Sequence, residues 1–236
     1  MNTMLRVSGV VKGYGGLRPF RLRDLAVARG DVVAVMGPDA AQAAVLVDLL
    51  TGTTLPDAGE VTAGGDSTRG IAGHEAWLAF LERFGLAGER VVLLPELTVL
   101  QNLAIPLTLS VDPIPPAIRP RVEALAAEAG LPPGVLATPV GRASAAERAR
   151  VRLGRAVALD PAILLLEHPT AGLDREAAAA YGAGLRALAG RRGLTVLAVT
   201  GDQAFARAAA TRVLEWRAAS GELIRSGGVL RRLLGR

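Results

Sequence analysis

A phosphate-binding loop is the first chemistry that the residues of this chain suggest. The apolar run Val32 to Met36 ends at Gly37-Pro38, and an apolar helical pattern resumes at Ala43. A strand, a loop and a helix in that order can offer backbone N–H groups and a helix N-terminus to phosphate. Such loops need glycines, a lysine and a hydroxyl, whereas residues 39–44 read Asp-Ala-Ala-Gln-Ala-Ala. The stretch is either a phosphate loop that has lost its chemistry or a strand-turn-helix that arose by chance.

The composition indicates a folded protein with a substantial core. The chain has 236 residues, 50% of them hydrophobic, and a mean hydropathy of +0.34. This length allows one large domain or two small ones. No apolar run approaches the roughly 18 residues that span a bilayer, so we expect no membrane helix and no signal peptide. With 0 cysteines, disulfides and thiolate metal sites are excluded, which is typical of cytosolic proteins.

The charge is basic, with a formal net charge of +5 and a pI near 10.8. Nucleic acid or an anionic membrane surface could exploit such a charge. However, the arginines are scattered along most of the chain, and aromatic residues make up only 3%. Stacking platforms for single strands are therefore scarce. We expect a solvated basic surface and no nucleic-acid partner.

The pattern of apolar runs predicts an α/β fold. Short buried strands are expected at 32–36, 163–166 and 195–200, the last two flanking a helical pattern at 174–188. Runs at 5–11 and 22–27 alternate as antiparallel strands do. From 97 to 158 the pattern is mostly helical. We predict one domain over 1–236: a parallel-sheet core of the P-loop NTPase type, an N-terminal antiparallel β subdomain and an inserted α-helical subdomain at about 90–158.

The order of these landmarks resembles the ATP-binding subunit of ABC transporters over nearly the whole chain. "LRVSGVVKGYGG" is similar to the family's opening strand, with Tyr14 as the aromatic residue that stacks on adenine. "GDVVAVMGPDAAQAAVLVDLLTG" is similar to the Walker A loop and its helix, and "LLPELTVLQNLAIPL" to the entrance of the helical subdomain. "GRASAAERARVRLGRAVALDPAILLLEHPTAGLD" is similar to the run from the signature sequence through Walker B to the D-loop. Five pieces in the right order, with "TVLAVTGD" as the fifth, make a chance strand-turn-helix a poor explanation.

The resemblance implies a Walker A loop without its functional groups. Ala40 and Gln42 stand at glycine positions, Ala43 at the position of the phosphate-binding lysine, and Ala44 at that of the magnesium-binding hydroxyl. Asp39 adds a negative charge inside the loop. The vestigial nucleotide site implied in this way comprises Tyr14, Gly37, Pro38, Asp39, Ala40, Ala41, Gln42, Ala43, Ala44 and Ser144. We expect binding of ATP and Mg²⁺ to be weak or absent.

The catalytic positions implied by the resemblance are also replaced. Glu167-His168 stands where the Walker B strand ends in Asp-Glu, Gly201 stands at the switch histidine, and Glu89 at the glutamine of the core–helical junction. Glu167 keeps a carboxylate on a longer stem, and neutral imidazole could accept a proton. The only other histidine is His74, which we expect on a distant surface. A structural or vestigial role for His168 is therefore favoured, and we expect no catalytic residue and no bound metal.

The signature sequence reads Ala143-Ser144-Ala145-Ala146-Glu147. Ser144 keeps the hydroxyl that would contact the ATP of an opposite subunit, but two alanines replace glycines and should hinder backbone approach. Alternatively, Ser144 is a helix N-cap and Glu147 completes a capping box.

The function expected from the resemblance is that of a catalytically inactive ATP-binding subunit, a pseudo-ATPase with a structural or regulatory role in a transport complex. It would lie in the cytoplasm or at the inner face of the membrane without inserting, docked to transmembrane subunits near 97–106. Its partner would be an identical or a different ATP-binding subunit. One alternative is a soluble regulatory module of the same ancestry without nucleotide. Another is residual ATP binding or ATPase activity that uses rewired site residues.

Overall fold

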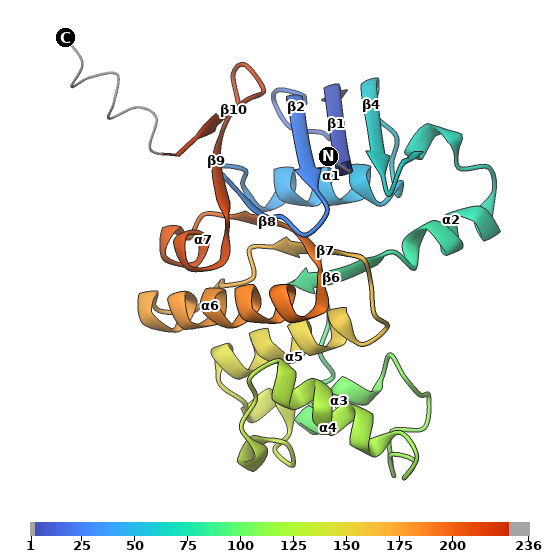
Figure 1. Ribbon diagram of the computed structural model, residues 1–236, viewed down its shortest axis with the longest axis vertical. Coiled ribbons are helices and arrows are strands. Elements are labelled where there is room, and N and C mark those ends of the chain that lie inside the picture. The colour runs from blue at the N-terminus through green and yellow to red at the C-terminus, as the bar shows by residue number, and fades with distance from the viewer. Residues whose placement is uncertain (1–2, 227–236) are drawn as a thin grey trace.

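A six-stranded, mostly parallel sheet forms the centre of the computed structural model, which describes residues 3–226 (Figure 1). The strand order is β10-β9-β3-β8-β7-β6, and only β10 runs antiparallel to its neighbour. Strands β3, β7 and β8 are almost wholly buried apolar runs, as expected for a parallel sheet covered on both faces. The strands are β3 (Val32–Met36), β6 (Phe84–Gly88), β7 (Ile163–Glu167), β8 (Thr195–Thr200), β9 (Arg212–Arg217) and β10 (Glu222–Arg225).

A second, antiparallel sheet comes mainly from the N-terminal part of the chain. Its order is β2-β1-β4-β5, with β1 (Thr3–Lys12), β2 (Phe20–Ala28), β4 (Ala58–Ala63) and β5 (Asp66–Ser67). Helix α1 (Ala40–Leu50) lies between this sheet and the central one (Figure 1). Its buried side chains, such as Leu46 and Leu49, share one hydrophobic cluster with Leu5 and Val7 of β1 and with Leu165 of β7. Burial on both sides fixes α1, and with it the loop that precedes it.

The opposite face of the central sheet is covered by α5 (Ala145–Val157), α6 (Arg175–Arg192) and α7 (Gln203–Ala209). Their apolar side chains, among them Leu153, Leu185 and Phe205, pack on Ala34, Leu164 and other residues of the sheet. Because both faces are covered, the edge at which the strands end is left for a functional site.

The helices at the lower end of Figure 1 form a third cluster around Leu103, Val122 and Val151. They are α3 (Val99–Ala104), α4 (Arg119–Glu128) and α5, joined by the single turns η2 (Pro133–Val135) and η3 (Val140–Arg142). The proposed boundaries of this subdomain, about 90–158, stay a prediction. The remaining elements are η1 (Thr68–Gly70) and α2 (His74–Leu81). None of the helices within residues 3–226 combines the length and apolar character required to cross a bilayer.

The predicted fold class is confirmed, with two local corrections. Strand β6, the edge strand beside β7, was not expected because its sequence, FGLAG, contains two glycines. Helix α1 begins at Ala40, three residues before the expected start of the helical pattern at Ala43. Both differences lie at the candidate site.

Candidate functional site

The sheet topology brings four of the expected site residues to one edge. Strand β6 pairs with β7 at Gly88 and Glu167, and β3 pairs with β8 at Met36 and Thr200. Since these strands are parallel, the residues that follow them lie together at their carboxyl ends. These residues are Gly37, Glu89, His168 and Gly201.

A hollow of about 510 Å³ lies at this edge. Its lining includes the carboxylates of Glu89 and Asp202, and within the described chain no lysine or arginine lines it. A triphosphate would therefore meet like charge here and no compensating cation. The lining residues are Ala40, Glu89, His168, Thr170, Ala171, Thr200, Gly201 and Asp202.

The residues of the expected phosphate loop form the start of a helix instead. Asp39 is the N-cap of α1, and its carboxylate accepts a hydrogen bond from the Gln42 N–H at 2.8 Å. The Gln42 side-chain oxygen accepts one from the Asp39 N–H at 2.9 Å. Alanine and glutamine favour helix, and aspartate is among the best N-caps. With Ala40 and Gln42 at the glycine positions, the helix therefore begins within the expected loop. The chain's own carboxylate thus lies at the helix N-terminus, where phosphate would bind.

The positions of the phosphate-binding lysine and the magnesium-binding hydroxyl are both occupied by alanine. Ala43 is 0% exposed in the core, and the partly buried Ala44 has no hydroxyl. Gly37 keeps its backbone role, because its φ is +113° and a Cβ there would lie 2.9 Å from the Trp216 carbonyl oxygen. Pro38 is buried, while Ala41 is exposed. The turn at Gly37 is kept, but the loop residues from Ala40 onward are helical and include neither a lysine nor a hydroxyl side chain.

Tyr14 lies against the same loop. Its side chain is partly buried against the core cluster, and its hydroxyl accepts a hydrogen bond from the Gln42 side-chain amide at 3.4 Å. Tyr14 and Gln42, two of the expected site residues, are therefore brought together and bonded to each other.

Glu167, at the end of β7, is paired with Arg90. The Arg90 Nε donates to one carboxylate oxygen of Glu167 at 2.7 Å, and a second guanidinium nitrogen donates to the other oxygen. Arg90 also contacts Asp48 of α1 at 3.2 Å. These hydrogen bonds, the one with Glu167 above all, raise the pKa of Arg90 above its ordinary value. The carboxylate aligned with the metal-binding position is already satisfied by a guanidinium.

Arg90 and Asp48 were not expected at the site. The signal that could have identified Arg90 is its position directly after Glu89, beyond the carboxyl end of the strand that neighbours Walker B. Because strand β6 was not predicted, nothing in the local pattern indicated that Arg90 lies beside Glu167.

His168 adopts a left-handed backbone conformation, with φ +40°. Its N–H donates to the Val199 carbonyl at 2.8 Å, and its Nε2 is buried without a hydrogen-bond partner in the described structure. Gly201, one strand away, contributes no side chain to the hollow. Among the described residues no carboxylate bonds the His168 imidazole, which removes the usual support of a general base.

Ser144 lies apart from this hollow, as the N-cap of α5. Its hydroxyl accepts the Glu147 N–H at 3.2 Å and donates to the Glu147 carboxylate at 2.8 Å. The alternative interpretation of Ser144, a capping box, is present in the structure.

The residues at the site do not fit Mg²⁺. Within residues 3–226, no group of three or more His, Asp or Glu side chains could hold a metal ion. Glu167 is bonded to Arg90, and Ala44 offers no side-chain oxygen. Magnesium requires oxygen ligands in near-octahedral geometry, which this site lacks.

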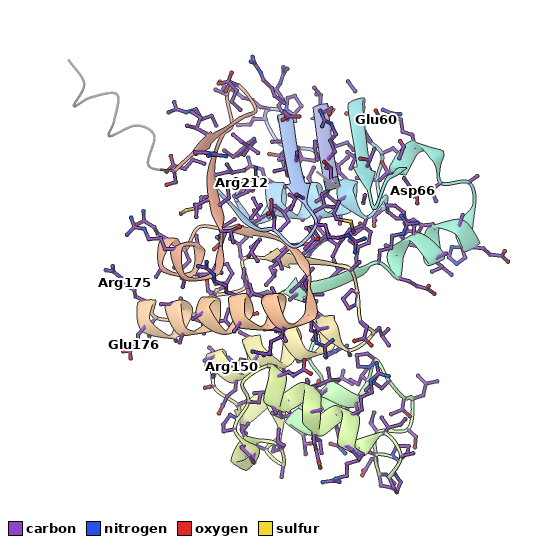
Figure 2. All side chains as sticks on the ribbon, in the orientation of Figure 1. Glu60, Asp66, Arg150, Arg175, Glu176 and Arg212 are labelled. Atoms are coloured by element: carbon purple, nitrogen blue, oxygen red, sulfur yellow. The ribbon has the colours of Figure 1, made fainter. Side chains whose placement is uncertain are left out.

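Charged side chains on the surface are spread over several elements. Figure 2 shows Arg150 on α5, Arg175 and Glu176 at the start of α6, and Arg212 on β9, with Glu60 on β4 far from them. These labelled arginines do not form a single basic patch.

Comparisons with known proteins agree on one family. Residues 21–171 match the model of the ABC transporter family. The chain is 34% identical over 229 residues to the Fe(3+) ions import ATP-binding protein FbpC of Streptomyces coelicolor, covering 95% of this chain and 62% of that protein. It is 30% identical over 207 residues to the lipoprotein-releasing system ATP-binding protein LolD of Alcanivorax borkumensis, covering 86% and 90%. A third relative, the sulfate/thiosulfate import ATP-binding protein CysA 2 of Chromobacterium violaceum, is 31% identical over 89% of this chain and 55% of its own.

Solved structures show the same fold. The dimeric bacterial ABC transporter cassette MJ0796 has a TM-score of 0.76 at 25% identity, covering 94% of this chain and 97% of that chain. The cbiO1 protein from Clostridium perfringens has a TM-score of 0.79 at 20% identity, covering 99% and 95%. The chain thus spans nearly all of these cassettes and of LolD, but only 62% and 55% of FbpC and CysA 2.

Proposed function

Because this chain belongs to the ABC transporter family, we propose that it is an ATP-binding-type subunit of a membrane transport complex that does not hydrolyse ATP. Its role is then structural or regulatory. The observation that carries the proposal is the Asp39–Gln42 capping box, which places the chain's own carboxylate at the N-terminus of α1.

The magnitudes favour an empty phosphate site. A lysine about 4 Å from a phosphate contributes roughly 4 kcal/mol at an effective dielectric constant of about 20. A helix N-terminus contributes only about 0.3–1 kcal/mol per charge, and here Asp39 already uses it. Ala43 supplies no cation, and the hollow beside it carries two carboxylates. Repulsion therefore outweighs the attraction that is left.

An ATPase with rewired residues is disfavoured by the same geometry. Glu167 is engaged by Arg90, and the buried Nε2 of His168 has no described partner. Phosphoryl transfer to water needs both a metal and a group that orients the water. Neither requirement is supported by the residues present.

An exposed apolar surface favours docking to a partner over a free regulator. Val92 is 70% and Leu94 is 46% exposed, at the start of the segment that leads into α3. Beside them, Trp77, Leu86 and other residues line an apolar pocket of about 260 Å³. We assign this surface to a transmembrane subunit of a transporter at the inner face of the membrane. The ATP-binding partner is a second copy or a related chain, in line with the dimeric cassette that the fold matches.

Calorimetric titration with Mg-ATP and with ADP tests the proposal. We expect no binding heat from the chain at millimolar nucleotide. The comparison variant carries Ala40→Gly, Gln42→Gly, Ala43→Lys and Ala44→Thr, which rebuild the loop; circular dichroism checks its folding, since Ala43 is buried. Micromolar binding by the unaltered chain would overturn the proposal.

A further inference from the structure

The connection between β6 and α3 is held by arginines from two sides. Arg90 reaches the core side, where it bonds Glu167 and Asp48. From α5, the Arg152 Nε donates to the Val91 carbonyl at 3.1 Å, and Arg155 donates to the Val92 carbonyl at 2.7 Å. Three guanidinium groups thus fix three consecutive residues, 90–92.

The close approach of the two strands makes the Arg90 contact geometrically specific. A Cβ on Gly88 would lie 2.6 Å from the Glu167 carbonyl oxygen, so β6 can end this near to β7 only with glycine at that position. Arg90 follows two residues later and meets the Glu167 carboxylate with both prongs of its guanidinium. A bidentate pair of this kind fixes orientation as well as distance.

The Glu167 carboxylate needs a cation at this position. Its side chain is only 14% exposed, whereas that of Arg90 is 50% exposed. A partly buried carboxylate without a partner would lose much of its hydration without compensation. On α5, burial lowers the pKa of both Arg152 and Arg155. These two guanidinium groups are therefore also partly desolvated where they contact the connection.

The far end of the connection is also fixed. Asn102, 0% exposed, accepts the Leu94 N–H at 2.9 Å and donates to the carbonyls of Leu94, Leu97 and Thr98. The stretch from Arg90 to Thr98 therefore has polar contacts at both ends, and the exposed Val92 and Leu94 lie between them.

We propose that Arg90 is an intramolecular cation that locks the connection between β6 and α3, so that the apolar surface at Val92 and Leu94 keeps one conformation whether or not nucleotide is present. The contact joins Glu167 of the central sheet, Asp48 of α1 and the connection itself. The inference goes beyond loss of hydrolysis, because it gives the subunit a permanently presented surface. It rests on the proposed function only in that Glu167 holds no metal.

Hydrogen–deuterium exchange of the full chain measures the lock directly. The amides of Val91 and Leu94 are suitable reporters, because they donate to the Gly88 carbonyl and the Asn102 side chain. In Arg90→Gln we expect exchange in residues 89–98 to be at least about tenfold faster, with β3 and α6 unchanged. Arg90→Lys should recover only part of the protection, because an ammonium group cannot bond both oxygens in parallel.

The matched control is Arg119→Gln, which removes an exposed pair with Glu123 on α4. It should leave residues 89–98 as they are in the unaltered chain. Glu167→Gln should loosen the same residues as Arg90→Gln does. Exchange in Arg90→Gln within about twofold of the unaltered chain would overturn the lock.

A measurement without a variant covers the case in which Arg90→Gln does not fold. Because the Arg90 side chain is 50% exposed, salt near 1 M, with a Debye length of about 3 Å, should weaken its ion pairs and speed exchange in residues 89–98 more than in the core strands. Equal exchange at low and high salt would count against the lock. Added Mg-ATP should leave the exchange of these residues unchanged.

Failure of the lock and failure of the proposed function give different results. No nucleotide heat together with unaltered exchange in Arg90→Gln removes the lock alone. Micromolar nucleotide binding together with faster exchange in Arg90→Gln overturns the proposal of an inactive subunit and leaves the lock supported.

Discussion

Replacing Asp39 by alanine tests the contact on which the proposed lack of phosphate binding depends. Asp39 is the N-cap of α1, and its carboxylate bonds the Gln42 N–H at 2.8 Å. Loss of such a cap costs about 1 kcal/mol, within a range of roughly 0.5–2 kcal/mol. For a chain of this size that loss lowers the midpoint of thermal unfolding by about 2–4 °C.

Asparagine at the same position separates the hydrogen bond from the charge. Asparagine caps about as well as aspartate, so Asp39→Asn should lose only the interaction of the charge with the helix dipole, about 0.3–1 kcal/mol. Asp174→Ala is the matched control, because Asp174 caps α6 through the Ala177 N–H at 2.8 Å and is not among the residues that line the hollow. Asp174→Ala should lower the free energy of unfolding by about as much as Asp39→Ala does.

Urea unfolding followed by circular dichroism measures all three variants. The reasoning is refuted if Asp39→Ala loses less than about 0.3 kcal/mol while Asp174→Ala loses about 1 kcal/mol. The carboxylate would then not be bonded to the helix N-terminus, and that end of α1 would be open to an anion.

Two further predictions concern the surroundings of the site. Asn102→Ala should lower the free energy of unfolding measured in urea by about 1–3 kcal/mol, because the partly buried backbone groups that bond the buried Asn102 side chain lose their partner. A loss below about 0.5 kcal/mol would contradict the network. The Gly13 N–H and Lys12 lower the pKa of Asp57 from its ordinary value of 3.8. Its stabilising contribution is therefore present above about pH 3.8 and lost as pH falls through the lower folded value. Asp57→Asn should be less stable than the unaltered chain at neutral pH and equal to it near pH 2, as measured by unfolding across pH. The same difference at both pH values would show that the charge of Asp57 is not the cause.

The buried strands could be predicted closely from the sequence. The runs at 32–36 and 195–200 are β3 and β8, and the run at 163–166 is β7 with Glu167 added. These strands are apolar on both faces, so their pattern does not depend on distant contacts. The capping box at Ser144 is similarly local, since both of its residues lie within one helical turn.

The parts that could not be predicted depend on long-range contacts. Strand β6 carries Gly85 and Gly88, which indicate a loop when considered alone. In the structure a Cβ on Gly85 would collide with the Ala156 carbonyl oxygen, and one on Gly88 would collide with that of Glu167. The two glycines of β6 therefore permit close packing of the strand against its neighbours and do not form a turn. The Arg90–Glu167 pair joins residues 77 positions apart, which no local pattern indicates.

The early start of α1 also affects how this chain can evolve. Glycine at position 40 would enter a helical turn, and glycine in a helix costs up to about 1 kcal/mol. A lysine at position 43 would enter a site that is 0% exposed, with no phosphate to neutralise it. Each single reversion lowers stability before any nucleotide can bind, and binding needs several reversions together. On the proposed function, selection on individual mutations therefore opposes a return to nucleotide binding, which makes the change hard to reverse.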